Sequence, residues 1–214
     1  MLRLVGWEGK QDLNIISTGE ALSRNLGKEL LDCGKNLWNF YGPTETTIYA
    51  TAKKVEDSDL KHRQISHWVS IGKSLPKTLI YILDSNLEPL PPGTPGEIFI
   101  GGFRVAGEYH QRPDLTSEVF LQNPFKKGAK FYRTGDLGYQ SAEGDIFYIN
   151  RKDNQIKLRG YRIELGEIEA KIRTIEGVNE AVVLLREDVE SDKKLVAYFK
   201  INTLIVFQSS VRLI

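Results

Sequence analysis

Residues 14–45 read NIISTGEALSRNLGKELLDCGKNLWNFYGPTE, and this stretch predicts a strand, a helix and a second strand in succession. Asn14 to Ser17 and Leu37 to Tyr41 are short extended segments. Between them Ser23 is a suitable N-cap, and apolar residues then recur at the spacing of one helix face. The residues at this spacing are Leu26, Leu30 and Cys33. Polar and aromatic residues follow the second strand, at the end where ligands bind in open α/β sheets.

The seven residues from Asn39 to Glu45 combine an aromatic ring, a bend, a hydroxyl and a carboxylate. Gly42 has no Cβ and lets the backbone pass close to a ligand, and Pro43 stiffens the exit from the bend. Thr44 can donate to a phosphate oxygen, and Glu45 is a hard oxygen ligand suited to Mg²⁺. The segment indicates a nucleotide site with a metal, although an ordinary Gly-Pro turn has the same letters.

The composition describes one large domain or two small ones, with 214 residues of which 41% are hydrophobic and 27% charged. The 29 basic and 28 acidic residues leave a net charge of +1, which gives no reason to bind nucleic acid or an anionic membrane. The single cysteine, Cys33, cannot form an internal disulfide and is expected to be a small buried apolar residue. Without a signal-peptide core or a bilayer-spanning run, we expect a cytoplasmic chain.

The middle of the chain is expected to be rich in strands. Residues 53–67 are polar and charged and predict a surface loop. Closely spaced strands then predict a barrel-like or small sheet packed on the first unit. The expected strands are Thr78–Leu83, Glu97–Ile100, Lys130–Tyr132 and Ile146–Ile149.

The pattern changes after the polar segment Arg151-Lys152-Asp153, which is a natural boundary. Paired strands are expected around Gly160, followed by a helix from about Glu164 to Gly177. The predicted buried face of this helix is Leu165, Ile168, Ile172 and Ile175. The predicted strands are Gln155–Leu158, Tyr161–Ile163, Val178–Leu185 and Leu195–Phe199. The fold class is therefore α/β followed by a small α+β unit.

Five motif segments stand in a fixed order along the chain. They are residues 17–22 (STGEAL), 41–47 (YGPTETT), 96–102 with 112–116 (GEIFIGG and RPDLT), 132–137 (YRTGDL) and 150–169 (NRKDNQIKLRGYRIELGEIE). In this order the chain resembles the adenylate-forming enzymes, and most closely the amino-acid-activating adenylation domains of nonribosomal peptide synthetases. The resemblance runs from about residue 14 to about residue 200. It implies the C-terminal part of the large adenylation subdomain over 1–152 and a small C-terminal subdomain over 153–214. The tail at 201–214 does not resemble the family.

The resemblance implies a site for the adenosine part of a nucleotide. Asn39 would bond the adenine edge, and Tyr41 and Tyr148 would flank the adenine ring. Asp136 would accept hydrogen bonds from both ribose hydroxyls, and Arg151 would reach the ribose side. A turn role remains open for Asp136, a plain strand role for Tyr148 and a surface role for Arg151.

The resemblance also implies the reacting end of the site. Thr44 would contact the α-phosphate, and Glu45 would hold Mg²⁺. Asp153 would be the hinge of the C-terminal unit, and Gly160 would enter the site for the thioester-forming step, where a side chain would leave no room. The implied substrate side-chain pocket includes Ile16, Thr18, Phe40, Ile48 and Tyr49.

The implied chemistry has two half-reactions. An amino-acid carboxylate attacks the α-phosphorus of ATP with Mg²⁺ bound, and the aminoacyl-adenylate then passes to a phosphopantetheine thiol on a peptidyl carrier protein. The implied partners are the carrier protein and other synthetase domains of secondary metabolite biosynthesis. Alternatives are a fragment of an acyl- or aryl-CoA ligase and a non-catalytic nucleotide-binding remnant.

Two departures from the family pattern concern lysines that hold the phosphates and the carboxylate. The Gly-rich Ser/Thr loop ending in Lys-Gly is absent, and so is the terminal Pro-Asn-Gly-Lys segment. Smaller departures are Asn150, where the family usually has glycine, and Gly107-Glu108, where it usually has Arg-Gly. We therefore expect a fragment that binds adenine nucleotide weakly and does not catalyse adenylation alone.

Overall fold

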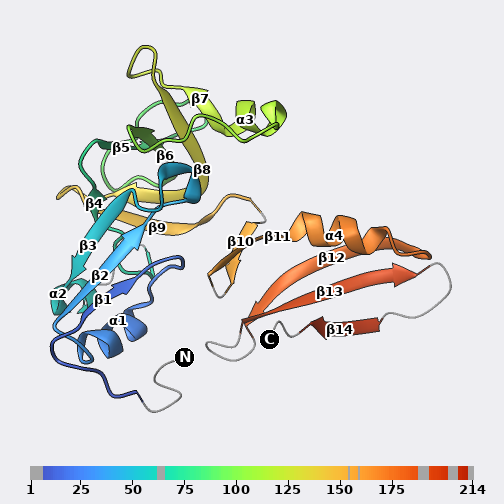
Figure 1. Cartoon of the computed structure of the whole chain (residues 1–214), viewed down its shortest axis with the longest axis horizontal. Coiled ribbons are helices and arrows are strands. Elements are labelled where there is room, and N and C mark those ends of the chain that lie inside the picture. Colours follow the sequence, from blue (N-terminus) through green and yellow to red (C-terminus); the bar gives the residue numbers. More distant parts are fainter. Residues whose placement is uncertain are drawn as a thin grey trace. The chain divides into compact units, whose positions relative to one another are not determined.

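The computed structural model describes residues 7–61, 66–153, 155–158, 160–187, 193–201 and 207–211. The chain divides into two compact units, Met1–Lys152 and Asp153–Ile214 (Figure 1). Among the described residues, no helix has both the length and the apolar character needed to cross a membrane.

The first unit begins with a four-stranded sheet in the order β1-β2-β3-β4 (Figure 1, blue to teal). β1 and β2 are parallel, and the other two pairs are antiparallel. A parallel pair requires a crossover, which the helix α1 supplies, so the predicted strand-helix-strand arrangement is confirmed. The bounds are β1 (Asn14–Ser17), α1 (Arg24–Leu31), β2 (Asn36–Tyr41), β3 (Thr51–Val55) and β4 (Lys73–Ser74).

Helix α1 starts as its sequence predicts, because the Ser23 hydroxyl accepts a hydrogen bond from the backbone N–H of Leu26 at 3.2 Å. The predicted face is wrong at Leu26, whose side chain is 44% exposed. The buried position is Gly27 instead, where an added Cβ would lie 3.0 Å from Leu60. Because Gly27 has no side chain, the helix backbone at this position lies close to the side chains of Leu60 and Val69. Cys33 is buried, as expected.

The predicted surface loop at 53–67 is wrong over its described part. Lys53 to Val55 belong to β3, and Asp57–Lys61 forms the short helix α2. Val55 is buried, and the ammonium of Lys53 pairs with Asp59 at 3.0 Å and with Asp145 at 2.7 Å. These ion pairs allow a charged sequence to form part of a sheet. Residues 62–65 lie outside the described residues.

The second sheet of this unit is antiparallel, in the order β5-β6-β8-β7 with β9 also paired to β8. All four predicted strands occur, and the described pairings form an open sheet rather than a closed barrel. An apolar cluster joins residues near the first sheet, including Tyr41 and Ala50, to Ile98 and Ile146 of the second. The remaining bounds are η2 (Thr44–Thr46), β5 (Thr78–Leu83), β6 (Gly96–Gly102), α3 (Pro113–Val119), β7 (Phe120–Gln122), β8 (Lys130–Gln140) and β9 (Ile146–Arg151).

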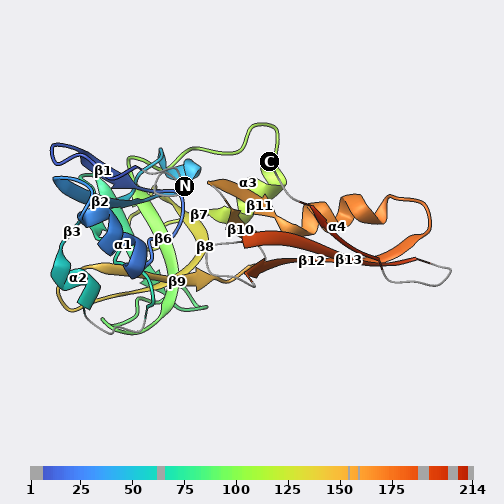
Figure 2. The same ribbon diagram turned by 90° about the horizontal axis from the view of Figure 1, so that it is seen from below.

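The described residues of the second unit form a two-stranded hairpin, one helix and a three-stranded antiparallel sheet. Figure 2 shows α4 lying along β12 and β13, and Leu165 of the helix packs with Val183 and Leu195 of these strands. The predicted burial of Ile175 is wrong, because the helix ends at Arg173 and Ile175 is 58% exposed. The bounds are β10 (Gln155–Leu158), β11 (Tyr161–Glu164), α4 (Leu165–Arg173), β12 (Val178–Glu187), β13 (Lys193–Ile201) and β14 (Phe207–Val211). The sequence did not predict β14.

Candidate functional site

Asp136 on β8 forms the centre of a buried polar cluster. Its Oδ2 accepts a hydrogen bond from the Tyr41 hydroxyl at 2.6 Å, and its Oδ1 pairs with Nη1 of Arg151 at 2.7 Å. The backbone N–H of Asp136 donates to the Thr134 hydroxyl at 3.0 Å. Asp136 is 2% exposed. The structure thus brings together three of the predicted nucleotide-site residues, which come from the end of β2, the middle of β8 and the end of β9.

Tyr41 contacts this cluster with its hydroxyl and the apolar core with its ring. The ring is 7% exposed and belongs to the cluster against which Tyr148 also packs. Burial raises the pKa of Tyr41 well above its ordinary value, and the Asp136 carboxylate raises it further. The phenol therefore remains a hydrogen-bond donor. Stacking of Tyr41 and Tyr148 on adenine stays a prediction, and the structure adds a contact for Tyr41 that the motif did not indicate.

Asn39 lies two residues before Tyr41 on β2, so both side chains are on the same, buried face of the strand. Its Nδ2 donates to the backbone carbonyl of Ser70 at 2.9 Å, in a buried hydrogen bond. The structure therefore gives this amide a role in joining β2 to the segment before β4. The predicted hydrogen bond to an adenine edge stays a prediction.

The turn after β2 carries Thr44 and Glu45 in the 3-10 helix η2. Thr44 is exposed, whereas Glu45 is 8% exposed and its Oε1 accepts a hydrogen bond from the Tyr109 hydroxyl at 2.5 Å. Burial, followed by the bond to Glu45, raises the pKa of Tyr109 above its ordinary value. The backbone carbonyl of Glu45 also accepts from the N–H of Ala106 at 2.8 Å. The predicted metal ligand is thus held by a residue that the sequence analysis did not single out.

The structure gives Gly42 a reason for its small size that the sequence analysis did not name. An added Cβ would lie 2.5 Å from the backbone oxygen of Ile48 and 2.7 Å from the backbone nitrogen of Ala50. This close approach is to the chain's own backbone, and the predicted close approach to a ligand stays a prediction. Gly42 therefore shapes the turn that carries Thr44 and Glu45.

The five predicted substrate-pocket residues are only partly brought together. The rings of Phe40 and Tyr49 lie 4.8 Å apart. Ile16 and Ile48 are exposed, at 55% and 63%, and Thr18 is exposed as well. A pocket made from these five positions stays a prediction.

Two predicted residues belong to the second unit. Asp153 is exposed, and its Oδ1 accepts a hydrogen bond from the backbone N–H of Gln155 at 3.1 Å. Gly160 has a φ of 81°, and no atom lies within 4 Å of the place of an added Cβ. The left-handed backbone favours glycine even though space is open. Their hinge and active-site roles stay predictions.

A second ion cluster was missed by sequence reasoning. The buried carboxylate of Glu97 on β6 pairs with Nε of Arg133 at 2.7 Å and with Nζ of Lys152 at 3.3 Å. The backbone N–H of Lys152 also donates to the carbonyl of Gly135 at 2.8 Å. Together with the Arg151–Asp136 pair, these contacts anchor the last two residues before Asp153 to the second sheet. No local pattern marks partners that lie 36 and 55 residues apart.

This cluster predicts a loss of stability in acid. Burial raises the pKa of Glu97, but the bonds to Arg133 and Lys152 lower it by more, so the pKa lies below its ordinary value. The carboxylate therefore stabilises the fold above its unfolded-state pKa of about 4.3, and this contribution is lost as the pH falls through the folded-state pKa. Urea unfolding of wild type and Glu97→Gln at successive pH values should give a stability difference that narrows in acid. An equal difference at every pH contradicts the prediction.

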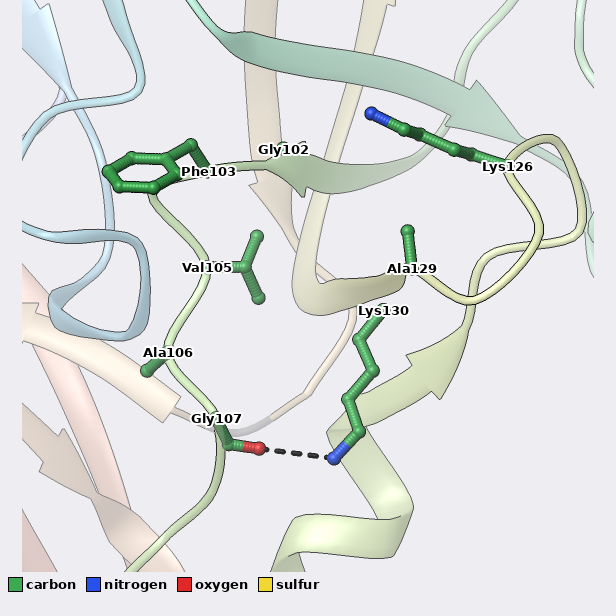
Figure 3. Close-up of a pocket in the computed structure, with 8 residues that line it drawn as sticks. All are labelled: Gly102, Phe103, Val105, Ala106, Gly107, Lys126, Ala129 and Lys130. Atoms are coloured by element: carbon green, nitrogen blue, oxygen red, sulfur yellow. Dashed lines mark hydrogen bonds between the residues drawn. The ribbon is translucent and has the colours of Figure 1, made fainter.

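A cavity of about 400 Å³ lies between the segment after β6 and the loop before β8 (Figure 3). One wall is formed by Phe103, Val105 and Ala106, and the other includes Lys126 and Lys130. Nζ of Lys130 donates to the Gly107 carbonyl at 3.2 Å, and this hydrogen bond joins the two walls (Figure 3). None of the predicted site residues lines this cavity.

The side chains around Glu45 can be compared with the ligands that Mg²⁺ commonly takes in proteins. Within the described ranges, no group of three or more His, Cys, Asp or Glu side chains could hold a metal ion. Mg²⁺ commonly takes one or two carboxylates and completes its shell with substrate phosphates and water. A single buried glutamate beside an exposed threonine hydroxyl fits that manner of binding.

Comparison with known proteins identifies the family. The family model described as AMP-binding enzyme matches residues 6–110. A dimodular nonribosomal peptide synthase of Bacillus subtilis is 43% identical over 192 residues, which are 89% of this chain and 8% of that protein. Tyrocidine synthase 1 of Brevibacillus parabrevis is 44% identical over 185 residues, which are 86% of this chain and 16% of that protein. The chain thus spans a small part of the length of these relatives.

Solved structures agree with these matches. A holo nonribosomal peptide synthetase protein containing adenylation and PCP domains superposes with a TM-score of 0.78 at 29% identity, over 87% of this chain and 32% of that one. A four-domain nonribosomal peptide synthetase bound to AMP and glycine superposes with a TM-score of 0.64 at 39% identity, over 95% of this chain and 15% of that one. This chain belongs to the AMP-binding enzymes, as part of an adenylation domain of the nonribosomal peptide synthetase type.

Proposed function

We propose that this chain is the part of an amino-acid adenylation domain that binds the adenosine and metal side of ATP. The observation that carries the proposal is the cluster of Tyr41, Asp136 and Arg151, in which Asp136 contacts Tyr41, 95 residues earlier in the chain, and Arg151, 15 residues later. A carboxylate offers about four lone-pair positions, so Asp136 can keep both protein contacts and still accept from a ribose diol.

The proposed reaction consumes ATP and an amino acid. The amino-acid carboxylate attacks the α-phosphorus, the bond to the bridging oxygen breaks, and pyrophosphate leaves. Phosphoryl and nucleotidyl transfer depend mostly on positioning and charge stabilisation. Thr44 would donate to an α-phosphate oxygen, and Glu45 would hold Mg²⁺, which offsets negative charge on the phosphates when bound.

The second half-reaction would use a carrier protein. The phosphopantetheine thiol attacks the carbonyl of the aminoacyl-adenylate, a thioester forms, and AMP leaves. Two of the solved relatives contain adenylation and PCP domains together, which supports a carrier-protein partner. Asp153 is proposed as the hinge for the change between the two steps, since the anchored Arg151 and Lys152 end the first unit immediately before it.

The relatives favour an amino acid over a fatty or aryl acid as substrate. The curated relatives are named peptide synthases, among them linear gramicidin and tyrocidine synthases, at 42–45% identity over at least 84% of this chain. No such observation favours a CoA ligase. ATP–pyrophosphate exchange distinguishes a non-catalytic nucleotide-binding role from the enzymatic role.

ATP–pyrophosphate exchange tests the proposal. We expect the 214-residue chain alone to bind ATP weakly and to show no exchange. It carries neither the Gly-rich loop ending in Lys-Gly nor the Pro-Asn-Gly-Lys segment that the family has. A chimera in which this chain replaces the matched 185 residues of tyrocidine synthase 1 should exchange with an amino acid. Robust exchange by the isolated chain contradicts the first expectation. A folded chimera that binds ATP without exchange favours the non-catalytic role.

A further inference from the structure

The segment between β6 and α3 holds the η2 turn at three points. The Tyr109 hydroxyl donates to Glu45 Oε1 at 2.5 Å, and the Ala106 N–H donates to the Glu45 carbonyl at 2.8 Å. The Thr47 hydroxyl donates to the carbonyl of Arg104 at 2.9 Å. The Tyr109 contact joins residues 64 apart in sequence and is the only one of the three that reaches the Glu45 carboxylate.

Tyr109 is itself fixed by its surroundings. Its backbone N–H donates to the Thr116 hydroxyl at 3.0 Å, and that hydroxyl donates to the carbonyl of Arg112 at 2.7 Å. Its ring lies edge-on to the ring of Phe120, with centroids 5.3 Å apart, and Phe120 is buried. The phenol is therefore a donor whose position is set by α3 and β7, and it transmits that position to the carboxylate it contacts.

We infer that Tyr109 is a positioning residue that orients the Glu45 carboxylate for Mg²⁺. The inference rests on the proposed function of Glu45. A free glutamate side chain loses rotamer entropy when it is fixed, and a standing hydrogen bond meets part of that cost before the metal arrives. A phenol is neutral, so it orients the carboxylate without cancelling its charge. Partners of metal ligands typically contribute about 10- to 100-fold to metal affinity.

The test measures how much Mg²⁺ strengthens ATP binding. Calorimetry on the 214-residue chain gives the ATP dissociation constant in EDTA and in excess Mg²⁺, and the ratio of the two is the Mg²⁺ gain. Tyr109→Phe keeps the ring against Phe120 and removes only the hydroxyl. We expect it to lower the Mg²⁺ gain by about 10-fold and to leave the EDTA constant unchanged.

Two further variants make the test decisive. Tyr81→Phe is the matched control, because it removes a hydroxyl on β5 that accepts from Asn123 Nδ2, just after β7, at 3.3 Å, and it should change neither constant. Glu45→Gln should abolish the Mg²⁺ gain. If Glu45→Gln loses the gain while Tyr109→Phe keeps or increases it, the inference is overturned and the function of Glu45 stands. The same holds if Tyr109→Phe only lowers the thermal unfolding midpoint.

The remaining outcomes separate the inference from the proposed function. If Glu45→Gln keeps the Mg²⁺ gain, the metal role of Glu45 and the inference about Tyr109 are both overturned, although ATP binding in EDTA still supports a nucleotide site. If the folded wild-type chain binds no ATP in either buffer, the proposed nucleotide site itself is overturned together with the inference.

Discussion

Replacement of Asp136 by asparagine is expected to lower the free energy of unfolding by about 3 kcal/mol, because it removes the carboxylate charge that pairs with the buried Arg151 guanidinium. The side chains of Asp136 and Arg151 are 3% and 10% exposed, and their atoms lie 2.7 Å apart. The Tyr41 hydroxyl also loses a charged acceptor. Urea unfolding of the chain measures the change, and ATP affinity should fall at least about 10-fold in the same variant, since hydrogen bonds to charged groups contribute about 1.5–3 kcal/mol.

Asp114→Asn is the matched control for this prediction. Asp114 forms an ion pair with Arg112 at 2.8 Å, close to the length of the buried pair, but both side chains are more than half exposed. Water and salt screen such a pair, so the urea midpoint and ATP affinity should stay at wild-type values. If both asparagine variants lower the midpoint equally, burial does not decide the strength of the Asp136 cluster. If Asp136→Asn unfolds easily but the folded fraction binds ATP normally, Asp136 is structural only.

The strands and helices were largely predictable because their signals are local. Ser23 caps α1 by a contact three residues away, and the parallel partners β1 and β2 lie on either side of that helix. The errors arise where contacts between residues distant in sequence decide the outcome. Leu26 fits the helical spacing but faces outward, since tertiary contacts at Gly27 decide which side of α1 is buried. Residues 53–61 looked like a loop because the partners of Lys53 are not adjacent in sequence.

The candidate site was predictable only where a motif carried it. Tyr41, Asp136 and Arg151 were named from segments that resemble a family, and the structure joins them through hydrogen bonds. Their direct contact did not follow from the motifs, which implied a shared ligand. Tyr109 lies outside the quoted motifs, and a tyrosine in a polar loop gives no signal that its hydroxyl meets a carboxylate 64 residues away. A single sequence indicates hydrophobic periodicity and helix caps. Contacts between side chains far apart in sequence depend on the tertiary structure.

Gly42→Ala is expected to lower the free energy of unfolding by about 3 kcal/mol, at the upper end of the usual cost of overpacking. The added Cβ would lie 2.5–2.8 Å from three backbone atoms, in Ile48, Tyr49 and Ala50. Backbone cannot rotate away as a side chain can, and Ala50 is fully buried with its N–H bonded to the Tyr41 carbonyl at 2.8 Å. The chain must therefore shift at the turn that carries Thr44 and Glu45, and ATP binding should be lost with the change in stability.

Gly107→Ala separates this steric effect from the general effect of removing a glycine. No atom lies within 4 Å of the added Cβ at Gly107, and neither glycine has a positive φ. The control should change the free energy of unfolding by no more than about 0.5 kcal/mol, since a compatible Gly→Ala change acts mainly by reducing the entropy of the unfolded chain. Equal stability of Gly42→Ala and wild type in urea would mean that residues 48–50 can move apart from Gly42. Loss of ATP binding at unchanged stability would instead assign Gly42 to the ligand, as its sequence first indicated.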